Sequence, residues 1–132
     1  MPRCQVIFYQ DENGAVPALD WLRAMGRRDL RVVQKLHARI ERLEEMGHEL
    51  RRPEGDLLRD GIYELRARLG NTNFRLLYFF DGRTVAVLAH GLTKEAGIPD
   101  AEIERALERK RRYEQNPSKH RYEPEAPDEA KK

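Results

Sequence analysis

Three short runs rich in β-branched and aromatic residues lie close together in the middle of the chain, and they constrain the fold more than any other feature. The runs are Ile62 to Arg68, Asn73 to Phe80 and Thr84 to His90. Gly70-Asn71 and Asp81-Gly82 separate them, and these residue types favour the positive φ angles of tight turns. Runs joined by such short turns predict consecutive antiparallel strands, and therefore a sheet built from hairpins.

The segment before these runs has the pattern of one strand and two helices. Cys4 to Tyr9 is predicted to be a first strand, and Pro17 to open a short helix with Gly26 as its C-terminal cap. Asp29 is a suitable N-cap for a longer helix that closes near Gly47. Its apolar residues recur at three- and four-residue spacing, at Leu30, Val33, Leu36, Ile40 and Leu43.

A last helix is predicted to begin at Pro99-Asp100 and to run for about fifteen residues. Its Ile103 and Leu107 form an apolar stripe that could cover Leu77 and Phe79 on the sheet. Alternatively, a helix of a partner protein could cover these two residues. The chain is therefore predicted to be an α+β protein. An N-terminal strand and two helices pack on an antiparallel sheet, and a C-terminal helix completes the fold.

Length and composition limit the organisation of the chain. Its 132 residues suit one domain over residues 1–115, while residues 116–132 contain three prolines and few apolar side chains and are predicted to be disordered. No apolar run approaches the roughly 20 residues needed to span a bilayer, so we expect a cytoplasmic protein without membrane contact. The single cysteine, Cys4, cannot form an internal disulfide and is predicted to be a small core residue.

Positive charge is concentrated on the predicted hairpins, although the net charge of the whole chain is only +2. Residues 65 to 94 carry five lysines and arginines and a single acid, Asp81. Because side chains alternate across a strand, Arg66, Arg68 and Arg75 are predicted to share one face, together with Glu64. This face is either a track for phosphate groups or an ordinary solvated surface on which Glu64 pairs with Arg66 or Arg68.

Candidate groups for catalysis are few in this region. Metal-dependent nucleases need clustered carboxylates, and Asp56 and Asp60, the acids nearest to Glu64, are predicted to be loop and turn residues rather than ligands. Neither a metal nor another cofactor is therefore predicted. His90 is the one near-neutral acid or base here, and it either makes a structural hydrogen bond at the end of its strand or takes part in proton transfer.

Several motifs in succession carry a resemblance to a known family. They are Asp60-Gly61-Ile62-Tyr63-Glu64-Leu65-Arg66, then Phe74-Arg75-Leu76-Leu77-Tyr78-Phe79-Phe80, then His90-Gly91-Leu92-Thr93-Lys94, and a helix with Glu102-Ile103-Glu104-Arg105-Ala106. Together they resemble the RelE/HigB toxin superfamily, and most closely its phage-derived HigB-like branch. The resemblance implies the toxin of a type II toxin-antitoxin system, a metal-independent endoribonuclease that cleaves mRNA on the ribosome. It also implies a cognate antitoxin with a helix-turn-helix domain.

The same resemblance implies roles for individual residues. Arg66 and Arg75 match strand cations that contact and activate the scissile phosphate, and Lys94 matches the basic position after the last strand. Arg68 is a weaker match and is predicted to bind RNA. Glu64 stands where RelE has a lysine, and the segment after Lys94 has no clear counterpart of RelE's tyrosine, so the general acid and base stay unassigned. Glu64 as base and His90 as acid are the two hypotheses.

Two other functions share this fold or this charge pattern. One is a ParE-like toxin, which is not an enzyme and acts on DNA gyrase through a protein interface. The other is an inactive phage-derived protein that only binds nucleic acid or an antitoxin-like partner. The nuclease hypothesis predicts that Arg66→Ala and Arg75→Ala each abolish growth arrest while the fold stays intact.

Overall fold

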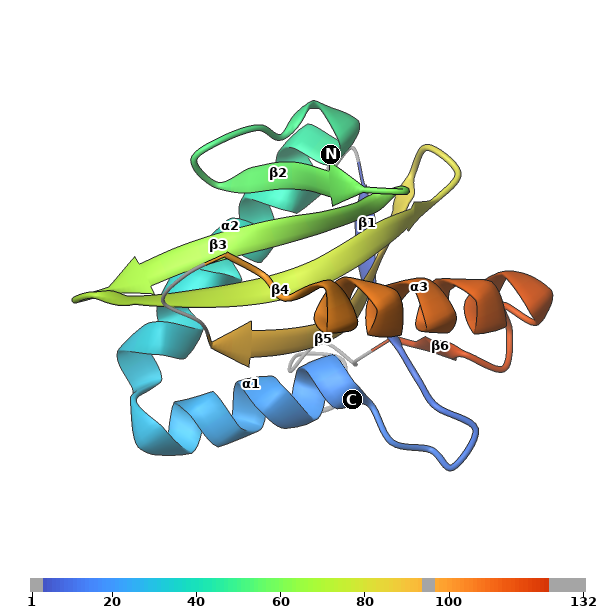
Figure 1. The fold of residues 1–132 in the computed structure, drawn as a ribbon, viewed down its shortest axis with the longest axis horizontal. Coiled ribbons are helices and arrows are strands. Elements are labelled where there is room, and N and C mark those ends of the chain that lie inside the picture. Colours follow the sequence, from blue (N-terminus) through green and yellow to red (C-terminus); the bar gives the residue numbers. More distant parts are fainter. Residues whose placement is uncertain (1–3, 94–96, 124–132) are drawn as a thin grey trace, which may run out of the picture.

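The computed structural model describes residues 4–93 and 97–123, which form a six-stranded sheet with helices on both faces (Figure 1). The strand order is β2-β3-β4-β5-β1-β6, and each neighbouring pair is antiparallel except β1 with β5. In chain order the elements are β1 (Gln5–Tyr9), α1 (Pro17–Arg28), α2 (Leu30–Met46), the 3-10 turn η1 (Gly47–Glu49), β2 (Gly55–Arg59), β3 (Ile62–Leu69), β4 (Thr72–Asp81), β5 (Val85–Thr93), α3 (Asp100–Gln115) and β6 (Arg121–Tyr122). The predicted α+β architecture is confirmed. None of the helices described is long and apolar enough to cross a membrane.

The three predicted central strands are β3, β4 and β5, and a further strand, β2, precedes them. β2 is antiparallel to β3, with Gly55 opposite Leu65 and Asp56 opposite Glu64. The prediction that Asp56 lies in a loop is therefore wrong, whereas Asp60 lies in the turn after β2 with a φ of 53°. Pro53 and Gly55 interrupt the strand pattern in the sequence. We infer that β2 forms because pairing with the exposed edge of β3 outweighs this local preference.

The two N-terminal helices meet at a tight corner. α1 continues through Gly26 to Arg28, so the predicted cap at Gly26 is wrong. Gly26 instead marks the close approach of the two helices, because a Cβ there would lie 3.2 Å from Cγ2 of Val33. Asp29 caps α2 as predicted, since its side chain accepts a hydrogen bond of 3.0 Å from the backbone N–H of Arg31.

The buried face of α2 contains Val32 in place of the predicted Leu30. Leu30 is 61% exposed, whereas Val32, Leu36 and Leu43 are buried. The buried stripe therefore passes through positions spaced four and seven residues apart, a spacing that keeps side chains on one side of a helix. Leu30 has the apolar character of this stripe but not its angular position.

An apolar core lies on each face of the sheet. The core under α1 and α2 includes Leu36, Leu65, Leu76 and Tyr78, and it also contains Cys4, as predicted. The other core is covered by α3, which crosses in front of the sheet in Figure 1. Its members are Ile7, Tyr9, Ile62, Leu77, Phe79, Val87, Ala89, Leu92, Ile103, Ala106 and Tyr113. The prediction that the C-terminal helix covers Leu77 and Phe79 is thus confirmed.

Gly91→Ala is expected to lower the free energy of unfolding by about 1–3 kcal/mol, because the core has no space for a side chain at this position. The ring of Trp21 from α1 lies against the backbone of β5 there, and a Cβ on Gly91 would overlap the ring. Urea denaturation followed by circular dichroism measures the change. Gly97→Ala is the matched control, since no atom of the described residues that could obstruct it lies within 4 Å of its Cβ position. If the Gly91 and Gly97 variants were equally stable, the close contact between Gly91 and the ring of Trp21 would be contradicted.

Residues 116–123 are ordered, which corrects the prediction that disorder begins at residue 116. β6 pairs antiparallel with β1, with Phe8 opposite Tyr122 and Tyr9 opposite Arg121. His120 is 3% exposed, stacks on Tyr9 at 5.3 Å between ring centroids, and places Nδ1 2.7 Å from the carbonyl oxygen of Gln10. Backbone pairing and one buried ring hold this segment, and neither is visible in its proline-rich, polar composition. The remainder of the predicted tail, residues 124–132, lies outside the described residues.

Candidate functional site

The register of β3 and β4 brings the predicted arginines together. Arg66 lies directly opposite Arg75, and Arg68 lies opposite Asn73 one step further toward the turn. Directly opposed residues in an antiparallel pair project to the same face of the sheet. All three arginines are therefore on the face that α3 covers in part, as the alternation predicted.

Glu64 is the acceptor at the centre of this cluster. It is 3% exposed, and its Oε1 accepts a hydrogen bond of 2.6 Å from Nη1 of Arg75, which is itself 7% exposed. Its second oxygen, Oε2, lies 3.6 Å from Nη2 of Arg66. Glu64 thus pairs with Arg66, as one alternative predicted, but the predicted solvated character of this pairing is wrong, because Glu64 is buried and its shorter contact is with the buried Arg75. Such a pair holds both side chains in place, since either charge left alone would be strongly destabilising.

Arg66 is the member of the cluster that still presents donors. Its side chain is 32% exposed, and its Nε is buried without a hydrogen-bond partner among the described residues. Its backbone is held rigidly, because Arg39 on α2 donates from Nε to the Arg66 carbonyl at 2.9 Å and Arg66 N–H donates to the Glu54 carbonyl at 3.0 Å. A planar guanidinium that is partly exposed suits bidentate contact with a phosphate.

Arg68 and Lys94 border the cluster in different ways. Arg68 is exposed and donates from Nε to the Gly70 carbonyl at 2.9 Å, so it folds back onto the turn between β3 and β4. Lys94 directly follows Thr93, the last residue of β5, and lies outside the described residues. The structure therefore brings Glu64, Arg66 and Arg75 together and places Arg68 at the rim.

A β-bulge turns His90 onto the α3 face. Leu77 pairs with His90 but Tyr78 pairs with Leu88, so Ala89 is an extra residue in β5. Strict alternation would direct His90 into the core under α1 and α2, and a bulge re-aims the side chains that follow it. His90 consequently projects to the same face as Leu77 and lies under α3, where it is 5% exposed.

Three residues of α3 surround the His90 ring. Arg109 Nη1 lies 2.7 Å from Nδ1, and Glu102 Oε1 lies 3.2 Å from Nε2, close enough for attraction although not aligned as a hydrogen bond. Arg105 donates in turn to Glu102 at 2.8 Å. Because a guanidinium can only donate, Nδ1 must accept and the neutral ring carries its proton on Nε2. Sequence reasoning missed these three residues. Their i, i+3 and i+7 spacing places them on one side of a helix, but the group that they face depends on where α3 docks.

Burial and, second to it, the positive charge of Arg109 lower the pKa of His90 to about 4, while Glu102 opposes the shift. At neutral pH the ring is therefore uncharged, with both nitrogens facing side chains of α3. This geometry favours a structural role for His90, in which it anchors α3 on the sheet. It does not favour the hypothesis of His90 as general acid, because an acid at neutral pH must hold a proton it can release to substrate.

The free energy of unfolding is expected to fall by about 3 kcal/mol through His90 alone as the pH is lowered from about 6.5 to about 4. The pKa of His90 is about 4 in the folded protein, below that of an exposed histidine, so the unfolded state binds more protons in this window. The stabilisation is complete above the unfolded pKa and is lost as the pH falls through the folded one. Urea titrations across this range should show a flatter pH dependence for His90→Gln than for the parent. His37 is exposed, so His37→Gln should show the same pH dependence of stability as the parent. If His90→Gln also showed the pH dependence of the parent, the low pKa assigned to His90 would be contradicted.

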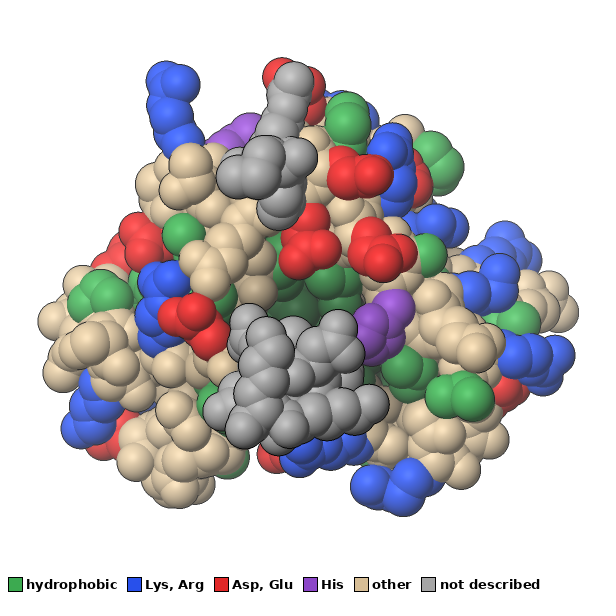
Figure 2. Space-filling model, turned by 180° about the vertical axis from the view of Figure 1, so that it is seen from behind, with side chains coloured by type: hydrophobic (Ala, Val, Ile, Leu, Met, Phe, Trp, Pro, Cys, Tyr) green, Lys and Arg blue, Asp and Glu red, His purple; other side chains and the backbone are tan. Residues whose placement is uncertain are grey.

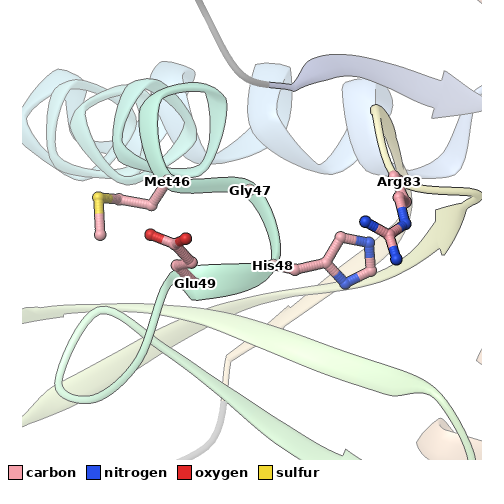
Figure 3. A pocket seen from close by; sticks show the side chains of 5 residues that line it. All are labelled: Met46, Gly47, His48, Glu49 and Arg83. Carbon is pink, nitrogen blue, oxygen red and sulfur yellow. The ribbon is translucent and has the colours of Figure 1, made fainter.

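Two hollows lie elsewhere on the surface. One is an apolar hollow between α1, α2 and β1, visible near the centre of Figure 2. The other, of about 520 Å³, lies between η1 and the turn after β4, where Met46, Gly47, His48, Glu49 and Arg83 line it (Figure 3). His48 stacks on Phe80 with 3.6 Å between ring centroids and places Nε2 3.1 Å from the Gly82 carbonyl, which gives it a structural role in that turn. Within residues 4–93 and 97–123, no three His, Cys, Asp or Glu side chains gather as metal ligands.

Comparison with known proteins places the chain in a family. A family profile described as "Phage derived protein Gp49-like (DUF891)" matches residues 20–111, which include most of α1, all of α2, the four strands β2 to β5 and most of α3. No curated protein matches the chain. The matched region covers well over half of the sequence and contains Glu64, Arg66, Arg75 and His90. The chain therefore belongs to the phage-derived Gp49-like family, which is related to RelE-type toxins.

Proposed function

We propose that this protein is the toxin of a type II toxin-antitoxin system of the HigB-like kind, and that it is a metal-independent endoribonuclease. Its substrate is mRNA on the ribosome, in the cytoplasm, and a cognate helix-turn-helix antitoxin silences it. The observation that carries this proposal is the partly exposed Arg66 guanidinium beside the buried pair of Glu64 and Arg75. Membership of the Gp49-like family supports the toxin class.

The cluster suggests a division of roles in catalysis. Arg66 binds the scissile phosphate and stabilises the negative charge that grows on its oxygens in the transition state, where a preorganised donor is most effective. Arg75 and Glu64 act as positioning residues, because their buried ion pair holds the carboxylate with which Arg66 forms its own ion pair. Glu64 is thus proposed as a support rather than as the general base.

The remaining predicted residues extend the path of the RNA. Lys94, which follows β5, is proposed to contact the phosphate next to the scissile one. Arg68, at the exposed end of β3, is proposed to bind the backbone further along without taking part in the reaction. His90 contributes by holding α3 on the sheet beside the cluster.

Primer extension on cellular mRNA after induction tests the proposal. We expect growth arrest within minutes and new 5′ ends inside translated regions, and we expect these cuts to disappear when translation initiation on a reporter transcript is blocked. Intact transcripts together with induced DNA damage would instead support the ParE-like function on gyrase. Harmless expression with neither effect would support an inactive protein that binds nucleic acid.

A further inference from the structure

The apolar hollow between α1, α2 and β1 lies on the sheet face opposite to α3, and its volume is about 510 Å³. Six apolar side chains line it: Val6, Phe8, Leu19, Leu22, Val33 and Ile40. Four of these remain only partly buried, namely Val6, Leu19, Val33 and Ile40. Figure 2 shows hydrophobic side chains at the bottom of the hollow, with acidic side chains and a histidine at its border. Concave apolar surface rimmed by polar groups is characteristic of interaction sites.

One wall of this hollow carries unpaired acids. Glu41 and Glu44 on α2 line it one helical turn apart, and neither forms an ion pair with any described residue. Burial raises the pKa of Glu44, and the neighbouring charge of Glu41 raises it further. His37 also lies on the α2 wall and Arg23 on the α1 wall. The acidic wall therefore lacks the cations that neutralise most other exposed acids of α2 and α3.

The shape of the hollow favours a helical occupant. Its α2 wall extends from Val33 to Glu44 through positions spaced three and four residues apart, a length of about 17 Å. Recognition of a strand requires a free sheet edge, whereas β1 is hydrogen-bonded to β5 on one side and to β6 on the other. A groove between two helices with a closed sheet as its floor is the geometry that accepts an amphipathic helix.

We propose that this hollow is the docking site for an amphipathic helix of a partner protein. Aliphatic side chains of that helix fill the hollow, and lysines or arginines along one flank pair with Glu41 and Glu44. Because the hollow and Arg66 lie on opposite faces of the sheet, a partner bound here leaves the arginine cluster open. The proposal is independent of the nuclease function.

The nine residues that follow Glu123 are a poorer match for the hollow. The described chain ends beside β1, where Gln5 Nε2 donates to Glu123 Oε1 at 2.9 Å, so this segment begins near the hollow. Residues 124–132 contain three acids, two lysines and no leucine, isoleucine, valine, methionine or phenylalanine. Such a segment lacks both large aliphatic side chains and the net positive charge that the acidic wall requires.

Binding of two designed peptides to the full chain tests the proposal. Both are helices of about 18 residues with leucines at i, i+3, i+4 and i+7, one flanked by lysines and the other by glutamates. Fluorescence anisotropy should show at least about tenfold tighter binding of the lysine peptide. Glu41→Lys with Glu44→Lys should reverse this preference. Glu108→Lys with Glu114→Lys on α3 changes the net charge equally and should leave the preference unchanged.

Three results would overturn the proposal: equal binding of the two peptides, a preference that survives the Glu41 and Glu44 reversal, or a preference that the α3 control reverses as well. A truncated chain that ends at Glu123 keeps every described element, and its binding to the lysine peptide is measured as a further test. If it binds the lysine peptide at least about tenfold more tightly than the full chain, the hollow belongs to the chain's own tail and not to a partner. Unchanged binding supports the proposal. None of these measurements depends on whether mRNA is cut.

Discussion

Arg66→Ala is expected to abolish growth arrest and to lower mRNA cleavage by at least about 100-fold. The variant removes the guanidinium of the cluster that is partly exposed beside the buried pair of Glu64 and Arg75. Its free energy of unfolding should change by less than about 1 kcal/mol, because its contact with Glu64 is long and partly solvated. Primer extension after induction measures cleavage, and urea denaturation of the purified variant measures stability.

Arg68→Ala is the matched control for this experiment. It makes the same substitution two residues along the same strand, at a side chain that donates hydrogen bonds to Gly70 and Asn71 in the nearby turn. We expect it to lower cleavage by less than about tenfold, since it removes one backbone contact from RNA binding. Arg66→Lys should be intermediate, because lysine keeps the charge but loses the planar fork. Full toxicity of Arg66→Ala would refute the assignment of the site.

Arg75→Met is expected to lower the free energy of unfolding by about 3–5 kcal/mol, because it leaves the carboxylate of Glu64 buried without its main partner. The sequence hypothesis expected the fold of an Arg75 variant to stay intact, since it placed this side chain on an open face. The structure shows Arg75 only 7% exposed, with a hydrogen bond of 2.6 Å to a carboxylate that is 3% exposed. Loss of toxicity in an Arg75 variant is therefore a consequence of stability as well as of catalysis.

The double variant Arg75→Met with Glu64→Leu separates these two effects. Replacing a buried ion pair with apolar side chains of similar volume is often close to neutral, so the double variant should recover most of the lost stability. Urea denaturation of the two single variants and the double variant yields their coupling energy. Stability losses that simply add would show that the pair does not act as a unit. A stable but inactive double variant would assign a catalytic contribution to the pair.

Much of the fold is predictable because it depends on local patterns. The three central strands, the cap at Asp29 and the helix from Asp100 each follow from residue types at short spacing. The strand alternation was also sufficient to place Arg66 and Arg75 on one face, because the short turn after Leu69 leaves little freedom of register. β2 and β6 were missed, since β2 depends on pairing with β3 and β6 on pairing with β1, which is distant in sequence, rather than on their own composition.

The chemistry of the site was harder to predict because it depends on docking. A bulge at Ala89 changes the direction of His90, and only the position of α3 brings Glu102 and Arg109 to its ring. Neither the bulge nor the docking position of α3 can be recognised from the sequence of one strand. The same docking turns a histidine of ordinary appearance into a neutral group at physiological pH.

The sequence by itself determined the α+β order of elements, the cation-rich strands and the face that Arg66 shares with Arg75, because alternation and turn chemistry are local properties. Only the tertiary structure decided which of these charges are buried. Glu64 and Arg75 form a closed pair while Arg66 keeps exposed donors, since exposure depends on how α3 and the neighbouring strands pack around each side chain. At the centre of the cation-rich face, Arg66 is therefore the exposed arginine beside a buried ion pair, and Arg68 is exposed at the rim.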